Sequence, residues 1–513
     1  MDHHRNPAGT FPNLTGSMAA PVDDLALQAR LRPDALAVAD LAREKRWTYR
    51  EFDLAVSRCA GALAARGVSP GDRVAALSKN RAELVMLHLA CARLGAIYVP
   101  LNWRLASEEI KGLLDDAEPK LFICEDGLDN APRADVSMED FSAEITSTEP
   151  AAPRPIDRDK PSLILFTSGT SGRPKGALLS ERNLAETAIN FSILGSVTER
   201  SVFLCDSPMF HIIGLITNVR PPMLRGGALL ISDAFIPARA LQRLGDPALQ
   251  VTHYFCVPQM ATMLRADPSY DPEKLRGLTG IFTGGAPHPA ANIRAWLKDG
   301  IPIADGFGMS EAGTVFGMPT DPALIDRHAG SAGLPTPRIQ LRIVDADGND
   351  VAIGDAGELL LKGDNITAGY WRRDQESREA FTNDGWFKTG DVARMNEEGF
   401  FWLVDRRKDM FISGGENVYP AEIEAVVAEI ADIRECAVVG VPDEKWGEVG
   451  QLFWVARDNA EVDGEAVGVA IGATLRKRLA HYKVPKHFTQ IDALPCNGAG
   501  KVLKTALREM ARK

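Results

Sequence analysis

A short loop rich in glycine and hydroxyl residues has the composition of an anion-binding site. Residues 167–176 read TSGTSGRPKG and directly follow the apolar run Leu163–Phe166, which predicts a buried strand. The three glycines leave backbone N–H groups free to converge on an anion, and the hydroxyl groups add further donors. Lys175 adds a positive charge suited to phosphate. The spacing matches neither a G-x4-G-K-[ST] phosphate loop nor a G-x-G-x-x-G dinucleotide turn, and an ordinary surface turn is the alternative.

Two segments further along the chain have residues suited to a nucleotide. The glycine pair of Gly284-Gly285-Ala286 follows the strand-like run 281–283, and glycine there allows backbone to approach a flat ring. The segment 306–311 reads GFGMSE and ends in Glu311, whose carboxylate oxygens suit Mg²⁺. Taken alone, the first is equally an ordinary turn at a strand end, and the second a solvated surface acid.

Two later segments offer a carboxylate and a lysine. Asp391 ends the segment WFKTGD, and its two oxygens suit the two hydroxyls of a ribose. Near the C-terminus, Lys501 is flanked by glycines in PCNGAGK, so this lysine can enter a site and withdraw from it. A lysine near a C-terminus is normally only solvated, and Lys504 is a lesser candidate for the same role.

In their order along the chain, these segments resemble those of the acyl-adenylate-forming enzymes, a family of acyl-CoA synthetases, luciferases and peptide-synthetase adenylation domains. The resemblance covers Ser162–Lys501 and extends upstream to YVPLN at 98–102. It implies an AMP-forming acyl-CoA synthetase that uses ATP, Mg²⁺ and coenzyme A. A carboxylic acid would become acyl-AMP with release of pyrophosphate, and CoA would then displace AMP.

The resemblance also implies roles for individual residues. Phe307 replaces the tyrosine that is usual in the family, which keeps a stacking ring but removes a hydroxyl. The residues implied in catalysis are Lys175, His211, Glu311 and Lys501, of which Glu311 is also the metal ligand. The residues implied in ATP binding are Thr167, Ser168, Gly169, Thr170, Ser171, Gly172, Gly284, Gly285, Ala286, Gly306, Phe307, Gly308, Met309, Ser310, Asp391 and Arg406. Lys408 is the implied hinge, and the implied CoA-binding residues are Ser413, Gly414, Gly415 and Glu416.

The residues around His211 indicate the kind of acid that is activated. By resemblance, His211 stands beside the substrate carboxylate, although a histidine with apolar neighbours is also a common core residue. Asp206 is five residues away and not at the position where relatives that activate amino acids carry an aspartate. The nearby segments 212–217, 255–257 and 315–317 are apolar. The sequence therefore predicts a medium-chain fatty acid or an aromatic acid as substrate.

The composition is that of an ordinary soluble protein. The net charge of −11 comes without a basic tract, which argues against nucleic-acid binding. The seven cysteines stand singly, which favours a reducing cytoplasm over a disulfide framework or a zinc site. We see neither an apolar run of membrane-spanning length nor a signal peptide, and a homodimer is a possible assembly.

The alternation of helical and strand patterns predicts an α/β fold. Residues 1–17 form a polar leader that we expect to be disordered. Residues 18–407 form the N-terminal adenylation domain, with two α/β subdomains and a small β subdomain after Pro335. Residues 408–513 form a mobile α+β domain, and residues 139–160 are predicted as a connection.

Other functions stay open at this point. An acyl-AMP ligase would pass the acyl group to a carrier protein, and a luciferase-type enzyme would oxidise the adenylate. A non-catalytic homologue would bind a nucleotide or an acyl ligand without turnover, but Lys175, Glu311, Asp391 and Lys501 argue against it.

Overall fold

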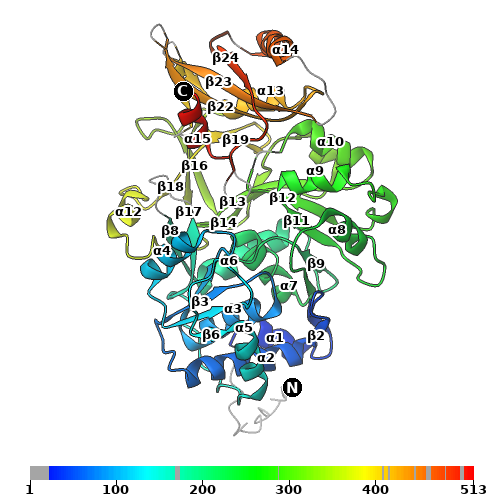
Figure 1. Ribbon diagram of the computed structural model, residues 1–513, viewed down its shortest axis with the longest axis vertical. Coiled ribbons are helices and arrows are strands. Elements are labelled where there is room, and N and C mark those ends of the chain that lie inside the picture. Colours follow the sequence, from blue (N-terminus) through cyan, green and yellow to red (C-terminus); the bar gives the residue numbers. More distant parts are fainter. Residues whose placement is uncertain are drawn as a thin grey trace, which may run out of the picture.

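The computed structural model describes residues 22–167, 174–286, 288–406, 409–413, 416–443, 446–457, 464–479, 481–496 and 502–512. These residues form a large N-terminal part and a smaller C-terminal part that sits at one end of it (Figure 1). Helices and strands occur in both parts. The predicted α/β class with a large N-terminal and a small C-terminal domain is confirmed.

The largest sheet has nine strands in the order β15-β14-β13-β12-β11-β9-β10-β1-β2. Its central strands, from β13 to β1, pair in parallel, whereas the edge strands β14, β15 and β2 are antiparallel to their neighbours. Central strands such as β10 are apolar throughout because both faces of the sheet are covered. The strands are β1 (Leu36–Asp40), β2 (Lys45–Thr48), β9 (Val202–Cys205), β10 (Ala228–Ile231), β11 (His253–Cys256), β12 (Gly280–Thr283), β13 (Ile303–Met309), β14 (Gly313–Gly317) and β15 (Leu334–Pro335).

A second sheet has six strands in the order β6-β5-β3-β4-β7-β8. Only β8 is antiparallel to its neighbour, and it forms a hairpin with β7. Alternate residues of β3 enter different cores: Val74 and Ala76 belong to the main core, and Ala75 and Leu77 pack with α4. The strands are β3 (Arg73–Leu77), β4 (Ile97–Leu101), β5 (Leu121–Cys124), β6 (Val136–Ser137), β7 (Pro161–Thr167) and β8 (Lys175–Ser180).

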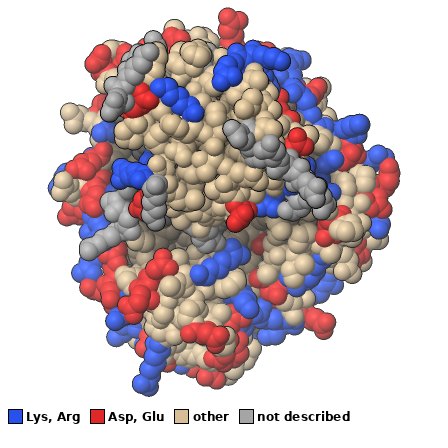
Figure 2. Space-filling view, turned by 45° about the horizontal axis from the view of Figure 1, so that its top comes forward, with Lys and Arg blue, Asp and Glu red and all other residues tan. Residues whose placement is uncertain are grey.

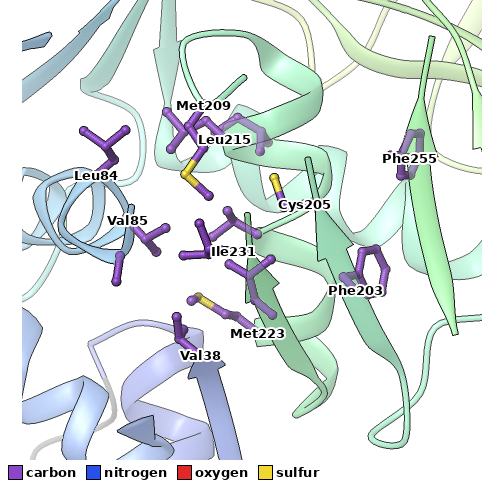
Figure 3. Packing of buried hydrophobic residues seen from close by; sticks show 14 of the residues in the cluster. Val38, Leu84, Val85, Phe203, Cys205, Met209, Leu215, Met223, Ile231 and Phe255 are labelled. Atoms are coloured by element: carbon purple, nitrogen blue, oxygen red, sulfur yellow. The ribbon is translucent and has the colours of Figure 1, made fainter. Parts of the chain in front are cut away.

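The main core joins the two sheets through shared helices. Helix α3 contacts β4 and β7 of one sheet and β1 of the other. Figure 3 shows Val85 of α3 close to Val38 of β1 and Ile231 of β10. The helices of this domain are α1 (Asp24–Leu31), α2 (Tyr49–Ala65), α3 (Ala82–Leu94), α4 (Ser107–Ala117), α5 (Met138–Ser147), α6 (Glu181–Leu194), α7 (Arg220–Arg225), α8 (Pro237–Leu244), α9 (Pro258–Ala266), α10 (Ala290–Lys298) and α11 (Pro322–Arg327), with a π-helix at η1 (Ile213–Thr217) and a 3₁₀-helix at η2 (Pro272–Lys274).

The last part of the N-terminal domain is an antiparallel sheet of four strands in the order β16-β17-β18-β19. The predicted small β subdomain after Pro335 therefore exists. Its elements are β16 (Gln340–Val344), β17 (Gly357–Lys362), α12 (Asp374–Glu379), β18 (Phe387–Met395) and β19 (Phe401–Arg406).

The C-terminal part has a five-stranded sheet in the order β21-β20-β23-β22, with β24 paired to β23. Ile423 of α13 and Ile471 of α14 pack into its core. Its elements are β20 (Phe411–Ser413), β21 (Glu416–Val418), α13 (Pro420–Val427), β22 (Ile433–Asp443), β23 (Gly447–Ala456), α14 (Gly464–Arg478), η3 (His481–Lys483), β24 (His487–Gln490) and α15 (Lys504–Met510).

The structure differs from the sequence prediction at residues 139–160, because α5 covers the start of this predicted connection. Ser137 caps the helix by accepting a hydrogen bond from the N–H of Asp140. Met138, Phe141 and Ile145 are buried on one face of the helix. These apolar residues are few and widely spaced, so the polar composition of the segment hid the helical pattern.

No helix among the described residues is long and apolar enough to cross a membrane. The predicted leader, residues 1–17, and the predicted domain boundary between residues 407 and 408 lie outside the part of the chain that the structure describes.

Candidate active site

The hairpin of β7 and β8 holds both ends of the predicted phosphate loop. Thr167 is paired with Lys175, and the Thr167 hydroxyl donates to the Lys175 carbonyl at 3.3 Å. The predicted phosphate ligands Ser168, Gly169, Thr170, Ser171 and Gly172 lie outside the described residues. The two strands therefore bring Thr167 and Lys175 to the base of the loop, side by side.

Residues 365–371 attach this hairpin to Glu311. The N–H of Leu178 donates to the carbonyl of Gly369 at 3.0 Å, and the N–H of Trp371 donates to that of Gly176 at 2.8 Å. On the other side, the N–H of Thr367 donates to the carbonyl of Glu311 at 2.7 Å. Because these are backbone hydrogen bonds, the segment fixes the position of the Glu311 backbone relative to β8.

The side chains of Lys175, Tyr370 and Glu311 meet beside the phosphate loop. The Tyr370 hydroxyl donates to Oε1 of Glu311 at 3.0 Å. The ammonium nitrogen of Lys175 lies over the Tyr370 ring, 5.3 Å from its centroid. Glu311 is buried, with 8% of its surface exposed. Two predicted catalytic residues thus come together, and Tyr370, which the sequence analysis did not identify, contacts both.

Glu311 stands in the turn that joins β13 to β14. The predicted nucleotide residues Gly306, Phe307, Gly308 and Met309 lie on β13, and Ser310 begins the turn. A Cβ atom at Gly308 would lie 2.4 Å from the carbonyl oxygen of Gly313 on β14. The close pairing of the two strands therefore requires glycine at this position.

The predicted adenine-side glycines border an apolar surface. Gly285 has φ +83°, a conformation that favours glycine, and Gly285 and Ala286 are exposed. Among the described residues, a Cβ atom built on Gly285 would meet Val257 at 3.8 Å and Ile213 at 3.9 Å. Val257 and Ile213 belong to two of the predicted apolar pocket segments, so the structure brings these segments to the predicted nucleotide site.

A buried polar cluster lies directly behind these glycines. The Thr283 hydroxyl donates to Asp305 at 2.8 Å and lies 3.0 Å from Nδ1 of His288. Burial raises the pKa of Asp305 to about 8 and lowers the pKa of His288 to about 4. Both side chains are therefore largely uncharged at neutral pH. Asp305 directly precedes Gly306, so the cluster supports the strand ends that carry the predicted nucleotide residues.

His211 is held in a turn between two buried side chains. Met209 and Leu215 flank it and pack in the main core (Figure 3), and the N–H of Leu215 donates to the His211 carbonyl at 3.0 Å. Burial, together with the positive charge of Arg104, lowers the pKa of His211 to about 4. The imidazole is therefore neutral at pH 7, which suits an uncharged pocket wall.

The predicted ribose ligands Asp391 and Arg406 face each other across two strands. They form a register pair between β18 and β19. Asp391 is buried, and its N–H donates to the Thr389 hydroxyl at 3.0 Å. The sheet thus brings the two backbone positions together; the side chain of Arg406 is not among the described parts.

The residues predicted to bind CoA and to form the hinge lie mostly outside the described chain. Ser413 and Glu416 pair across the short hairpin of β20 and β21, whereas Gly414 and Gly415 lie outside, as do Lys408 and Lys501. Lys504, the lesser candidate for the catalytic lysine, pairs with Glu424 at 3.0 Å within the C-terminal domain. The ion pair anchors the Lys504 side chain to α13, and its part in catalysis stays a prediction.

The C-terminal domain contacts the large domain beside the sheet ends. The Gln259 amide on α9 donates to Glu435 on β22 at 3.5 Å, and α13 contacts β19. Figure 2 shows a hollow on this face, below the C-terminal domain, with basic and acidic side chains at its rim.

Comparison with known proteins assigns the chain to a family. Residues 25–371 match the sequence profile of AMP-binding enzymes, and residues 422–501 match that of the AMP-binding enzyme C-terminal domain. The chain belongs to the AMP-binding enzyme family.

Similar proteins cover nearly its whole length. A feruloyl-CoA synthase of Amycolatopsis sp is 36% identical over 491 residues, which are 94% of this chain and 97% of that protein. A long-chain-fatty-acid–CoA ligase of Mycobacterium tuberculosis is 34% identical over 503 residues, 94% of this chain and 96% of that protein. The crystal structure of ATP-bound MatB from Rhodopseudomonas palustris aligns with a TM-score of 0.86 and 30% identity over 95% of this chain and 99% of that one. The predicted class, an AMP-forming acid–CoA ligase, is confirmed.

Tyr370 and Asp305 escaped the sequence analysis for different reasons. Tyr370 stands 59 residues from Glu311 in the sequence, and their contact depends on the backbone hydrogen bonds that hold residues 365–371 in place. Asp305 directly precedes the GFGMSE segment, so its position could have marked it as a site neighbour. Its unusual pKa depends on burial, which sequence patterns do not report.

Proposed function

We propose that this ligase joins an apolar carboxylic acid to CoA through an acyl-adenylate, and that the predicted residues carry both steps. The observation that supports this best is the meeting of Lys175, Tyr370 and Glu311 at the base of the phosphate loop. A cation and a buried carboxylate beside a glycine-rich loop provide the charges that ATP and its metal ion need.

In the first step, a carboxylate oxygen of the acid attacks the α-phosphorus of ATP. The bond from this phosphorus to the oxygen that bridges to the β-phosphate breaks, and pyrophosphate leaves. We assign Lys175 to the transferred phosphates, Lys501 to the carboxylate and α-phosphate, and Asp391 with Arg406 to the ribose. These groups mainly orient reactants and stabilise charge, because the substrate supplies the nucleophile.

Glu311 fits a magnesium ligand. Its side chain is buried at the base of the phosphate loop, and Oε1 accepts a hydrogen bond from the Tyr370 hydroxyl. Hard oxygen ligands of this kind suit Mg²⁺, which neutralises charge on the phosphates when it is bound.

In the second step, the CoA sulfur attacks the acyl carbon and AMP leaves. We propose that the C-terminal domain rotates about Lys408, so that Lys501 withdraws and residues 413–416 line the CoA path. The hydrogen bond between Gln259 and Glu435 is long, at 3.5 Å, and exposed, so such a movement can break it at little cost.

We propose a medium-chain fatty acid or an aromatic acid as the substrate. Ile213 and Val257 lie next to Gly285 and are apolar, and the neutral His211 stands two residues before Ile213 in the sequence. The similar proteins act on ferulate and on long-chain fatty acids, both of which have a largely apolar body. We propose a cytoplasmic location because all seven cysteines are free. The homodimer stays a prediction, which sedimentation analysis can test.

The test is pyrophosphate release over a panel of aliphatic and aryl acids, with and without CoA. We expect multiple turnovers that require both the acid and CoA. Release that stops after one turnover at every CoA concentration would point instead to another acyl acceptor, such as a carrier protein. Light emission would indicate oxidation of the adenylate, and absence of any ATP turnover a non-catalytic homologue.

A further inference from the structure

Tyr370 occupies a fixed position between two groups of opposite charge. Its backbone belongs to the segment that pairs with β8, as an antiparallel bridge joins Tyr370 to Ala177. The flanking hydrogen bonds from Trp371 to Gly176 and from Leu178 to Gly369 fix this segment on both sides of Tyr370. The side chain is therefore presented from a rigid support.

The tyrosine contacts Glu311 and Lys175 with different parts of its side chain. Its hydroxyl donates to Oε1 of Glu311 at 3.0 Å, whereas its face receives the Lys175 ammonium 5.3 Å from the centroid. An ammonium and a carboxylate on the same partly buried tyrosine attract each other. A direct ion pair between them would occupy both groups before ATP arrives.

We propose that Tyr370 is a positioning residue for the adenylation step, which rests on the proposed function of this site. Its hydroxyl orients the Glu311 carboxylate toward the metal that accompanies ATP. Its ring holds Lys175 apart from that carboxylate, so that the lysine is released to the phosphates. Tyr370 therefore serves the step that involves the triphosphate and has no part in the transfer to CoA.

The variant Tyr370→Phe tests this proposal because it keeps the ring and removes only the hydroxyl. A hydrogen bond to a charged group typically corresponds to about a ten- to hundredfold effect. We expect acid-dependent pyrophosphate release to fall by about this factor, with a higher Mg²⁺ concentration needed for half-maximal rate. Conversion of supplied acyl-AMP and CoA to the thioester should stay within about twofold of wild type.

A matched control exists elsewhere in the same domain. The Tyr270 hydroxyl also donates to a carboxylate, that of Asp299 at 2.7 Å, and the Arg265 guanidinium lies over its ring at 5.4 Å. None of these three is among the predicted site residues. The variant Tyr270→Phe therefore removes the same kind of hydrogen bond, and we expect wild-type magnesium dependence.

A double-mutant cycle with Glu311→Gln shows whether Tyr370 acts through Glu311. We expect Tyr370→Phe to have little further effect in the Glu311→Gln background. Equal losses in both backgrounds, equal losses in both half-reactions, or the same magnesium dependence for Tyr370→Phe and Tyr270→Phe would overturn the proposal. If the wild type itself releases no pyrophosphate with any acid, the proposed function fails instead.

Discussion

At the scale of single residues, burial rather than charge pairing sets the ionisation of the site. Asp305 and His211 both lie where their charged forms are poorly solvated, and their pKa values move in opposite directions, to about 8 and about 4. Each shift makes a prediction about a specific variant.

The free energy of unfolding of the Asp305→Asn variant should rise, relative to that of the wild type, as the pH rises. The folded state keeps a proton on Asp305 up to about pH 8, whereas the unfolded state loses it near pH 4, so wild-type stability falls across this window. An asparagine never ionises and avoids this loss. Urea unfolding at pH 6 and pH 9 should show the variant gaining up to about 3 kcal/mol relative to wild type. A difference that does not change with pH would contradict the assignment.

His211→Ala should change the kinetic constants for the acid more than those for ATP. The imidazole is neutral, and we propose it as part of the wall of the acid pocket, so we expect kcat/KM for the acid to fall by about tenfold, or about 1.4 kcal/mol. The KM for ATP should change less than twofold. Steady-state kinetics with each substrate varied in turn measure these constants. A rise in the KM for ATP as large as the loss for the acid would contradict the position of His211 in the acid pocket.

At the scale of elements, the site depends on strands that approach each other unusually closely. The pair β13 and β14 carries Glu311 in its turn, and the segment 365–371 connects that turn to β8. The sequence predicted the small β subdomain after Pro335, in which β16 and β17 stand between clear turn residues. It did not predict β14 or the connection through residues 365–371, since such pairings join residues far apart in the chain.

Gly308→Ala should disrupt this strand pair. The new methyl group would lie 2.4 Å from the Gly313 carbonyl oxygen, so β14 must shift, at a cost of about 1–3 kcal/mol. We expect a lower melting temperature and loss of most pyrophosphate release. Gly112→Ala on α4 is the control, since nothing lies within 4 Å of its added methyl group and alanine favours a helix. Equal melting temperatures for Gly308→Ala and wild type would refute this role of β14.

At the scale of the whole molecule, we propose that the two domains divide the reaction between them. In the N-terminal domain, Lys175 and Glu311 meet at Tyr370, and Asp391 and Arg406 are a register pair of β18 and β19. The order of motifs predicts that these groups share one nucleotide site, which stays a prediction. Lys408, Gly415 and Lys501 lie outside the described residues, and their roles stay predictions as well.

The division predicts opposite defects for two variants. Lys501→Ala should lose adenylation by at least about a hundredfold, since a charge-stabilising group is removed, yet still convert supplied acyl-AMP to the thioester. Gly415→Leu should adenylate normally and lose the transfer to CoA, because its side chain would fill the thiol path. Single-turnover assays of each half-reaction separate the two. A shared loss of only the first half-reaction would contradict the two-state account.

The central claim is that the acid is activated as an adenylate, and an oxygen-transfer measurement tests it most directly. A carboxylic acid labelled with ¹⁸O in both carboxyl oxygens is turned over with ATP and CoA. The masses of the AMP and acyl-CoA products are then measured by mass spectrometry. Because the carboxylate oxygen attacks the α-phosphorus, each AMP should carry one ¹⁸O and each acyl-CoA should keep the other. Unlabelled AMP, or label in pyrophosphate or inorganic phosphate, would contradict the account.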